Sequence, residues 1–255
     1  MQKSLYLVLF VAFFTSRCTT LEFEKPIPFK AVSIDKCPEM LVGQFMEQKE
    51  NAEPQLLQEI LSFESPKPHQ WLVYEYKQFN DKDLKNFPTF EVKNNLLIQH
   101  IKAPLNDGET SKDSIVETPI QRTEKGYQTA KQLGYSLNFS TKTITQYPEP
   151  TDKETGIKTG TFDMRQKGDT YYLNVKGLVT EDNWYVVMFT PTTELLTVNM
   201  LSQFSDDNEE DINAIMPLTK LDDDTYLAKP TEAQLNAFLK YPEAGDVSVF
   251  KRLKK

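Results

Sequence analysis

The side chains that most often carry catalysis or bind metals are scarce in this chain. It contains two cysteines, Cys18 and Cys37, and two histidines, His69 and His100. Neither histidine has a Cys, Asp or Glu at the spacing of a metal-binding motif, and the chain has no H-x-x-x-H or C-x-x-C. His69 lies in a proline-rich turn, and His100 ends a predicted strand. The sequence therefore predicts no metal site, no cofactor and no histidine-based catalytic triad.

Three short motifs match, in order, the S-x-x-K, S-x-N and K-T-G elements of penicillin-recognising enzymes. They begin at Ser33, Ser136 and Lys158. That chemistry needs the serine at the start of a helix, so that Lys36 follows one turn later beside the hydroxyl group. Pro38 comes two residues after Lys36 and would disrupt such a helix. An envelope hydrolase is therefore the remotest alternative, and we expect a protein without catalytic residues that is not an enzyme.

Two acidic runs, residues 206–211 and 222–224, contain the hard oxygen ligands that calcium prefers. Neither run shows the twelve-residue loop pattern with a central glycine. The favoured interpretation is a helix N-terminus enriched in acids for the first run and a hairpin turn for the second.

The N-terminus has the features of a secretory signal peptide. Lys3 supplies a positive charge before residues 5–14, which are all apolar. As a helix this run would span about 15 Å, half of the roughly 30 Å hydrocarbon core, so it is too short to cross a membrane. Charge, length and flanks together predict a signal peptide over residues 1–17. The alternative, a buried helix that is apolar on every face, is rare as the first element of a water-soluble protein.

Cys18, directly after this segment, resembles the lipidated cysteine of bacterial lipoproteins. In such proteins the chain is cut just before the cysteine, its thiol is diacylated and the new N-terminus is acylated as well. Ser16 fits the motif, whereas Arg17 stands where a small residue is usual. The resemblance implies lipidation of Cys18, with incorporation of palmitate, and three acyl chains would anchor the protein firmly. The alternative is an ordinary cleaved signal, in which case Cys18 and Cys37 could form a disulfide.

Composition and charge exclude several classes of protein. Of the 255 residues 39% are hydrophobic and 11% aromatic, which is too much apolar surface for a disordered chain. A mean hydropathy of −0.51 and a single apolar run exclude a polytopic membrane protein. The net charge of −8 gives no basic field for nucleic acid. An acidic body is also repelled by an anionic membrane surface, so the lipid anchor must hold it there.

The mature chain is expected to have two parts. Residues 18–36 carry Pro26 and Pro28 and predict an extended spacer behind the lipidated cysteine. Residues 37–255 predict a single β-barrel domain, because short strands alternate with turn residues at regular spacing. The predicted strands are 41–46, 71–76, 90–92, 96–101, 135–140, 161–166, 171–175, 184–189, 195–201 and 247–253.

Turns, helices and loops separate these strands. Asn94-Asn95 and the turn around Gly168 predict two tight hairpins. Two or three peripheral helices are expected: residues 56–61 after Asn51 as N-cap, a helix behind the capping box Thr231-x-x-Gln234, and a weaker one over 209–215. The polar stretches 104–118 and 148–160 are predicted loops, and a two-domain alternative would divide the chain near the second.

The order of the later elements resembles a group of lipoproteins. The order of these elements resembles that of uncharacterised Bacteroidetes-type lipoproteins with lipocalin-like barrels. The elements are residues 171–176, 184–189 and 195–198, followed by a capped helix and a last strand. Cys37-Pro38 followed by Leu41-x-Gly43-x-Phe45 is similar to the opening of their barrels, with Phe45 where lipocalins have Trp. The resemblance covers residues 37–77 and 160–253. It implies a mainly β, antiparallel, lipocalin-like barrel at the outer membrane, facing the periplasm or the cell surface, without an established activity.

The aromatic residues within the strands bear on function. Trp71, Tyr74, Tyr76, Trp184 and Tyr185 alternate along two strands, and such rings either fill a barrel core or form a stacking platform for a ligand. The core interpretation is favoured. We expect a non-enzymatic envelope lipoprotein that binds a small apolar ligand in its barrel, or an envelope protein as partner. The alternative is a structural or interaction lipoprotein with a packed core and no ligand.

Overall fold

The computed structural model describes residues 18–48, 56–102, 113–148, 156–178, 181–242 and 244–253. The predicted signal peptide, residues 1–17, lies outside the described residues, as does Asn51.

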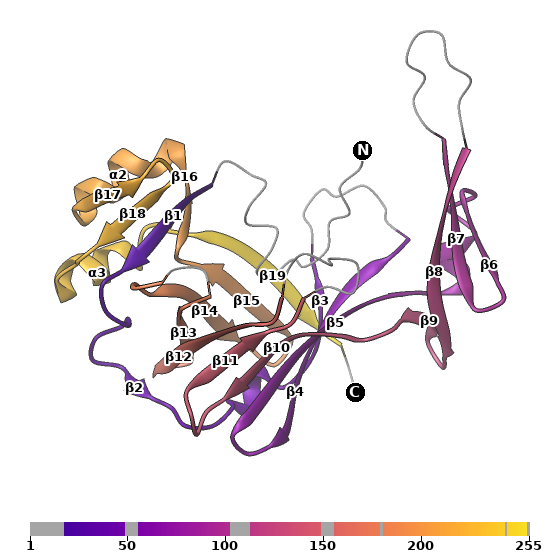
Figure 1. Cartoon of the computed structure of the whole chain (residues 1–255), viewed down its shortest axis with the longest axis horizontal. Coiled ribbons are helices and arrows are strands. Elements are labelled where there is room, and N and C mark those ends of the chain that lie inside the picture. The colour runs from indigo at the N-terminus through magenta and orange to yellow at the C-terminus, as the bar shows by residue number, and fades with distance from the viewer. Residues whose placement is uncertain are drawn as a thin grey trace, which may run out of the picture.

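Ten antiparallel strands close into a barrel (Figure 1). Around the barrel the strands are β10 (Gln132–Asn138), β11 (Thr143–Gln146), β12 (Lys158–Lys167), β13 (Thr170–Lys176), β14 (Tyr185–Pro191), β15 (Leu195–Met200), β19 (Asp246–Arg252), β3 (Gly43–Glu47), β4 (Gln58–Lys67) and β5 (Gln70–Phe79). Strand β5 pairs again with β10, which closes the barrel. The predicted fold class, a mainly β antiparallel barrel with few helices, is confirmed.

Local turn chemistry explains the hairpins that the sequence predicts. Asn94 and Asn95 have φ angles of 54° and 62°, the left-handed pair that a two-residue hairpin turn requires. They connect β6 (Phe90–Lys93) to β7 (Leu96–Lys102). Gly168, with φ of 62°, turns the chain between β12 and β13.

A second sheet of four strands lies beside the barrel (Figure 1). Its order is β16 (Gln203–Ser205), β1 (Cys18–Phe23), β18 (Thr225–Ala228) and β17 (Leu218–Asp222), and β1 runs parallel to β18. The helices α2 (Glu209–Ile215) and α3 (Glu232–Phe238) pack with it. Its core includes Tyr172 and Val186 from the outer face of the barrel. Strands β13 and β14 are therefore buried on both faces, which explains their nearly continuous apolar sequence.

The N-terminal segment, residues 18–36, was predicted as an extended spacer, and part of it packs into the second sheet. Residues 18–36 are extended in part, but Leu21, Phe23 and Ile27 are fully buried in the second core. A short strand, β2 (Val32–Ser33), pairs with β12. The alternation of Leu21 and Phe23 is a strand pattern of period two, and the neighbouring prolines obscured it.

An arm of three strands projects away from the barrel, opposite the second sheet (Figure 1). It consists of β6, β7 and β8 (Asp113–Thr123), and β9 (Gly126–Thr129) connects β8 to β5. Leu56, Phe79, Leu97 and Ile120 form the small core at its base. Since β8 begins at Asp113, the predicted loop over 104–118 is wrong in its last part.

Two of the predicted helices are confirmed and one is wrong. Helix α2 forms as expected, and α3 starts at a complete capping box in which Thr231 N donates to Gln234 Oε1 at 2.8 Å. Residues 58–61, within the predicted helix 56–61, belong to β4 instead. In this strand Leu61 faces the barrel core and Ile60 is buried on the other side. A strand buried on both faces has adjacent apolar residues that imitate a helical stripe. One further helix, α1 (Asp81–Leu84), is a single turn capped by Asn80.

Candidate functional site

The barrel interior, where a small apolar ligand was expected, is filled by aromatic side chains. Phe63 and Trp71 stack with ring centroids 5.2 Å apart, and both meet Phe189 edge-on, at 6.5 and 5.9 Å. The space left beside these rings is about 20 Å³. A single water molecule occupies such a volume, whereas ligand pockets measure about 300–1,000 Å³.

The aromatic residues singled out in the sequence take three positions. Trp71 and Tyr185 lie in the barrel core. Tyr74 and Tyr76 follow at alternate positions on the outer face, where the Lys131 amine lies 5.8 Å from each ring. Trp184 packs against the second core. None of the five is an exposed stacking platform, so their positions agree with a structural role.

The two histidines lie in unrelated places. His69 is in the turn between β4 and β5, and its Nδ1 lies 2.7 Å from the Asp35 carbonyl oxygen. His100 is in the arm, and its Nε2 lies 3.6 Å from a carboxylate oxygen of Glu91. In the part of the chain that the structure describes, no group of three or more Cys, His, Asp or Glu could hold a metal ion.

The three motifs of the hydrolase alternative are not brought together. Ser33 lies in a strand, not at the start of a helix, and pairs with Arg165. Arg165 and Lys158 both belong to β12, and at the rise of an extended strand Lys158 lies about 23 Å from Arg165. Ser136 lies opposite Thr145 of β11, so only the second and third motifs are near one another.

The acidic runs adopt the structures that the sequence favours. Residues 206–208 form a 3-10 turn that leads into α2. Residues 222–224 turn between β17 and β18, where the Asp224 amide donates to Asp222 Oδ1 at 3.1 Å.

The two cysteines are in different parts of the fold. Cys18 is the first residue of β1 and lies opposite Ser205 in the second sheet. Cys37 is a free thiol, 7% exposed, in the barrel core cluster. Burial raises its pKa to about 12, so the thiol stays protonated and unreactive at neutral pH.

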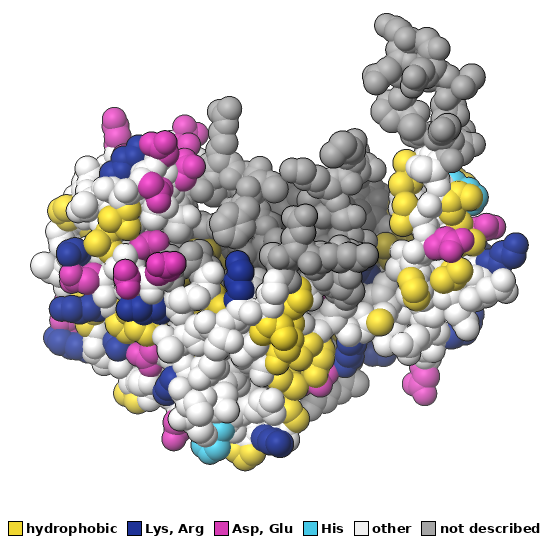
Figure 2. All heavy atoms as spheres, in the orientation of Figure 1, with side chains coloured by type: hydrophobic (Ala, Val, Ile, Leu, Met, Phe, Trp, Pro, Cys, Tyr) yellow, Lys and Arg dark blue, Asp and Glu magenta, His cyan; other side chains and the backbone are white. Residues whose placement is uncertain are grey.

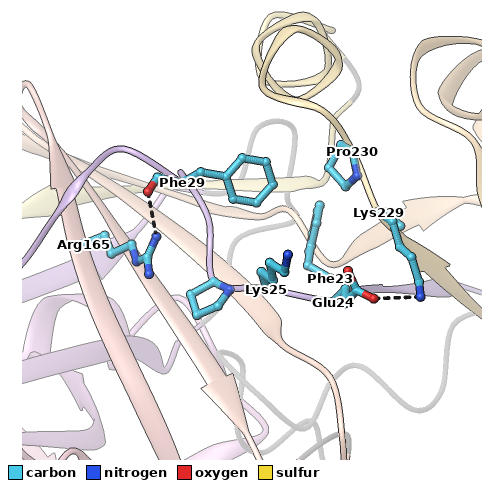
Figure 3. A pocket seen from close by; sticks show the side chains of 9 residues that line it. Phe23, Glu24, Lys25, Phe29, Arg165, Lys229 and Pro230 are labelled. Atoms are coloured by element: carbon cyan, nitrogen blue, oxygen red, sulfur yellow. Dashed lines mark hydrogen bonds and ion pairs between the residues drawn. The ribbon is translucent and has the colours of Figure 1, made fainter.

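A cleft of about 510 Å³ lies between the barrel wall and the second sheet (Figure 3). Glu24, Lys25 and Lys229 line it from the ends of β1 and β18, and Arg165 lines it from β12. Strands β1 and β18 are parallel, with Phe23 opposite Ala228. Because parallel strands end at the same edge, residues that follow both strands emerge side by side.

The charged groups of the cleft are held in defined positions. Arg165 donates from Nε to Asp163 Oδ2 at 2.7 Å and from Nη1 to the Pro28 carbonyl oxygen at 2.9 Å. Lys229 forms an ion pair with Glu24 at 2.7 Å, and this hydrogen-bonded contact lowers the pKa of the Glu24 carboxyl. Lys25 is exposed, and its charge also lowers the pKa of the Glu24 carboxyl.

No motif in the sequence pointed to this cleft. Three Lys-Pro dipeptides lie at strand ends. Lys25-Pro26 and Lys229-Pro230 line the cleft, whereas Lys67-Pro68 ends β4 and leads into the turn before β5. A residue before proline is held extended, which carries Lys25 and Lys229 beyond the strand ends. The dipeptide alone did not mark the cleft, because the parallel pairing that brings two of its three copies together joins segments that are far apart in the chain.

The fold and these sites define the protein as a closed, ten-stranded antiparallel β-barrel protein with a packed interior, compatible with a lipocalin-like barrel. Comparisons with protein families, with curated protein sequences and with solved structures find no match. Among the helices of the described ranges, none is both long and apolar enough to cross a bilayer.

Proposed function

We propose that the protein is a lipoprotein of a bacterial cell envelope, of the Bacteroidetes type, anchored in the outer membrane through palmitate-carrying Cys18. In this proposal it has no catalytic activity, faces the periplasm or the cell surface, and acts by binding an envelope protein. The barrel is the rigid scaffold for that interaction.

The filled barrel interior carries this proposal. Phe63, Trp71 and Phe189 occupy the space in which a lipocalin-like barrel would hold a ligand, and about 20 Å³ remains. This favours the partner-binding function over a small apolar ligand inside the barrel.

The arm is the surface that we assign to the partner. Ile115 and Val116 in β8 are 57% and 44% exposed, and as neighbours in a strand they face opposite sides. Figure 2 shows hydrophobic side chains gathered on this arm. Within the described residues β6 pairs on one side only, with β7, which leaves an open strand edge. Such an edge can accept a strand of another protein by backbone hydrogen bonds.

The position of Cys18 agrees with this arrangement. A lipid on the first residue of β1 would hold the second sheet near the bilayer. The arm lies on the opposite side of the barrel (Figure 1) and would reach away from the anchored side.

Site-specific photocrosslinking in the native host tests the proposal. We expect a photoreactive residue at position 115 to crosslink one envelope protein in high yield. Leu221, which is 48% exposed in β17, is the matched control position and should not capture that protein. An Ile115→Thr change should reduce co-isolation of the captured protein without lowering stability, since the side chain is exposed. Native mass spectrometry that shows a small apolar molecule bound in stoichiometric amount, with no specific crosslink from position 115, would contradict the proposal.

A further inference from the structure

The ends of β1 and β18 form a cationic edge. Phe23 and Ala228 are opposite one another in the parallel pair, and the Glu24 amide donates to the Ala228 carbonyl oxygen at 3.2 Å. The chain then continues as Lys25-Pro26 on one strand and Lys229-Pro230 on the other. Two lysine side chains therefore border the same cleft from neighbouring strands.

Arg165 supplies a third cation from the barrel wall. Its Nε and Nη1 donate to Asp163 and to the Pro28 and Phe29 carbonyl oxygens, which holds the guanidinium in place. Its Nη2 has no hydrogen-bond partner among the described residues. In Figure 3 the Lys25 side chain lies between Arg165 and the Glu24–Lys229 pair.

The charges lining the cleft are not balanced. Glu24 is the one carboxylate among the lining residues, and it is already paired with Lys229. Asp163 beside the cleft is already paired with Arg165. Lys25, Lys229 and Arg165 thus face two carboxylates, Glu24 and Asp163, which leaves an excess of positive charge in a chain whose net charge is −8. A cleft with a local excess of positive charge concentrates anions.

Apolar rings complete the lining. Pro26, Phe29 and Pro230 contribute flat apolar surfaces beside the charged groups. The volume of about 510 Å³ falls within the range of small-molecule sites. Lys30, which follows Phe29 in the chain, forms an ion pair at 2.6 Å with Glu232 of α3.

From this combination we infer that the cleft binds a small organic anion, a carboxylate or phosphate monoester joined to a compact apolar group. The anionic group contacts the Lys25 amine and Arg165 Nη2, and the apolar group lies against Phe29 and the prolines. This site is separate from the barrel interior and from the arm, so the inference does not depend on the proposed function.

Calorimetric titration of the detergent-purified protein tests the inference, with phenyl phosphate as probe and neutral benzyl alcohol as its uncharged counterpart. We expect phenyl phosphate to bind at least about tenfold more tightly than benzyl alcohol, because charge-assisted hydrogen bonds are the stronger ones. The Lys25→Gln variant should bind phenyl phosphate about threefold to tenfold more weakly. Lys93→Gln, the same charge change at an exposed position of the arm, should leave the affinity unchanged.

Equal affinities of the Lys25→Gln and Lys93→Gln variants would overturn the inference, as would equal binding of the neutral compound or no binding of phenyl phosphate.

The headgroup of an anionic phospholipid has the same chemistry as a free phosphate monoester. Flotation of the unanchored Cys18→Ser variant with phosphatidylglycerol vesicles separates the two sources. Flotation that requires Lys25 supports the site with a lipid as ligand, and phenyl phosphate binding without flotation supports it with a free anion.

Discussion

Asn174 binds both backbone polar groups of Ile27. The Ile27 amide donates to Asn174 Oδ1 at 2.7 Å, and Asn174 Nδ2 donates to the Ile27 carbonyl oxygen at 2.9 Å. Both residues are fully buried. The carboxamide thus makes the two hydrogen bonds that a neighbouring strand would otherwise supply. It holds the N-terminal segment, which forms one wall of the cleft lined by Lys25 and Arg165, against β13 of the barrel.

Replacing Asn174 by alanine should therefore destabilise the protein. It leaves the N–H and C=O groups of Ile27 buried without partners, and we expect a loss of about 2–5 kcal/mol in the free energy of unfolding. Urea denaturation of wild type and variant measures this loss. Asn236→Ala removes a surface hydrogen bond to Lys167 and is the control, with an expected change within about 0.5 kcal/mol. Equal effects of the two changes would contradict the bridging role of Asn174.

The packed barrel interior predicts a large effect of Phe189→Ala. Truncating this side chain opens a void beside Trp71 and should cost about 3–5 kcal/mol. An apolar void of this kind binds benzene. Benzene should therefore raise the Tm of the Phe189→Ala variant and leave that of the wild type unchanged. Leu221→Ala, at an exposed site, serves as control. A benzene-dependent Tm in the wild type would mean that the native barrel already holds a ligand cavity.

Glu22 in β1 predicts a pH dependence of stability. Burial raises the pKa of its carboxyl, Asp222 and Asp182 raise it further, and the hydrogen bond from Asn183 lowers it. The native state then binds the proton more tightly than the unfolded state does. The resulting stabilisation is complete below the unfolded pKa of about 4.5 and is lost as the pH rises through the raised native pKa.

The Glu22→Gln variant should consequently gain stability relative to wild type as the pH rises from 4 to 7, measured by urea denaturation. Glu24 is the matched control, because its pKa is lowered by Lys229 and the sign is reversed. Glu24→Gln should show no such gain at pH 7. A difference between Glu22→Gln and wild type that is the same at pH 4 and pH 7 would rule out this contribution.

If Cys18 is acylated, palmitate incorporation should depend on Cys18 and not on Cys37. Labelled palmitate should be incorporated into the wild type and into Cys37→Ser, because the Cys37 thiol is buried and protonated. Cys18→Ser should abolish the label and release the protein from the membrane fraction. Incorporation that survives Cys18→Ser would refute the lipoprotein proposal.

Features determined by neighbouring residues could be predicted from the sequence. The Asn94-Asn95 hairpin follows from the tolerance of asparagine for positive φ, and the start of α3 follows from the Thr231 and Gln234 side chains. The alternation of residues 135–140 predicted most of β10. These signals depend on dihedral preferences and on the period of side-chain direction, which act over a few residues.

Burial on a second face could not be predicted in the same way. Ile60 and Leu61 appeared helical because one faces the barrel core and the other is covered from outside. Leu21 and Phe23 appeared to belong to a spacer because the sheet that covers them is built from residues 203–228. Apolar residues reveal that they will be buried, but not which distant segment will cover them.

The sequence by itself determined that the chain is rich in strands, where its tight turns lie and where its capped helix begins. It also supplied enough aromatic side chains to fill a ten-stranded barrel. Tertiary structure alone decided which aromatic residues face inward and that Lys25, Arg165 and Lys229 share one cleft. The physical reason is that strand register and the parallel pairing of β1 with β18 result from contacts between segments that are about two hundred residues apart. Such contacts form only when the whole chain packs, and no local pattern of residues specifies them.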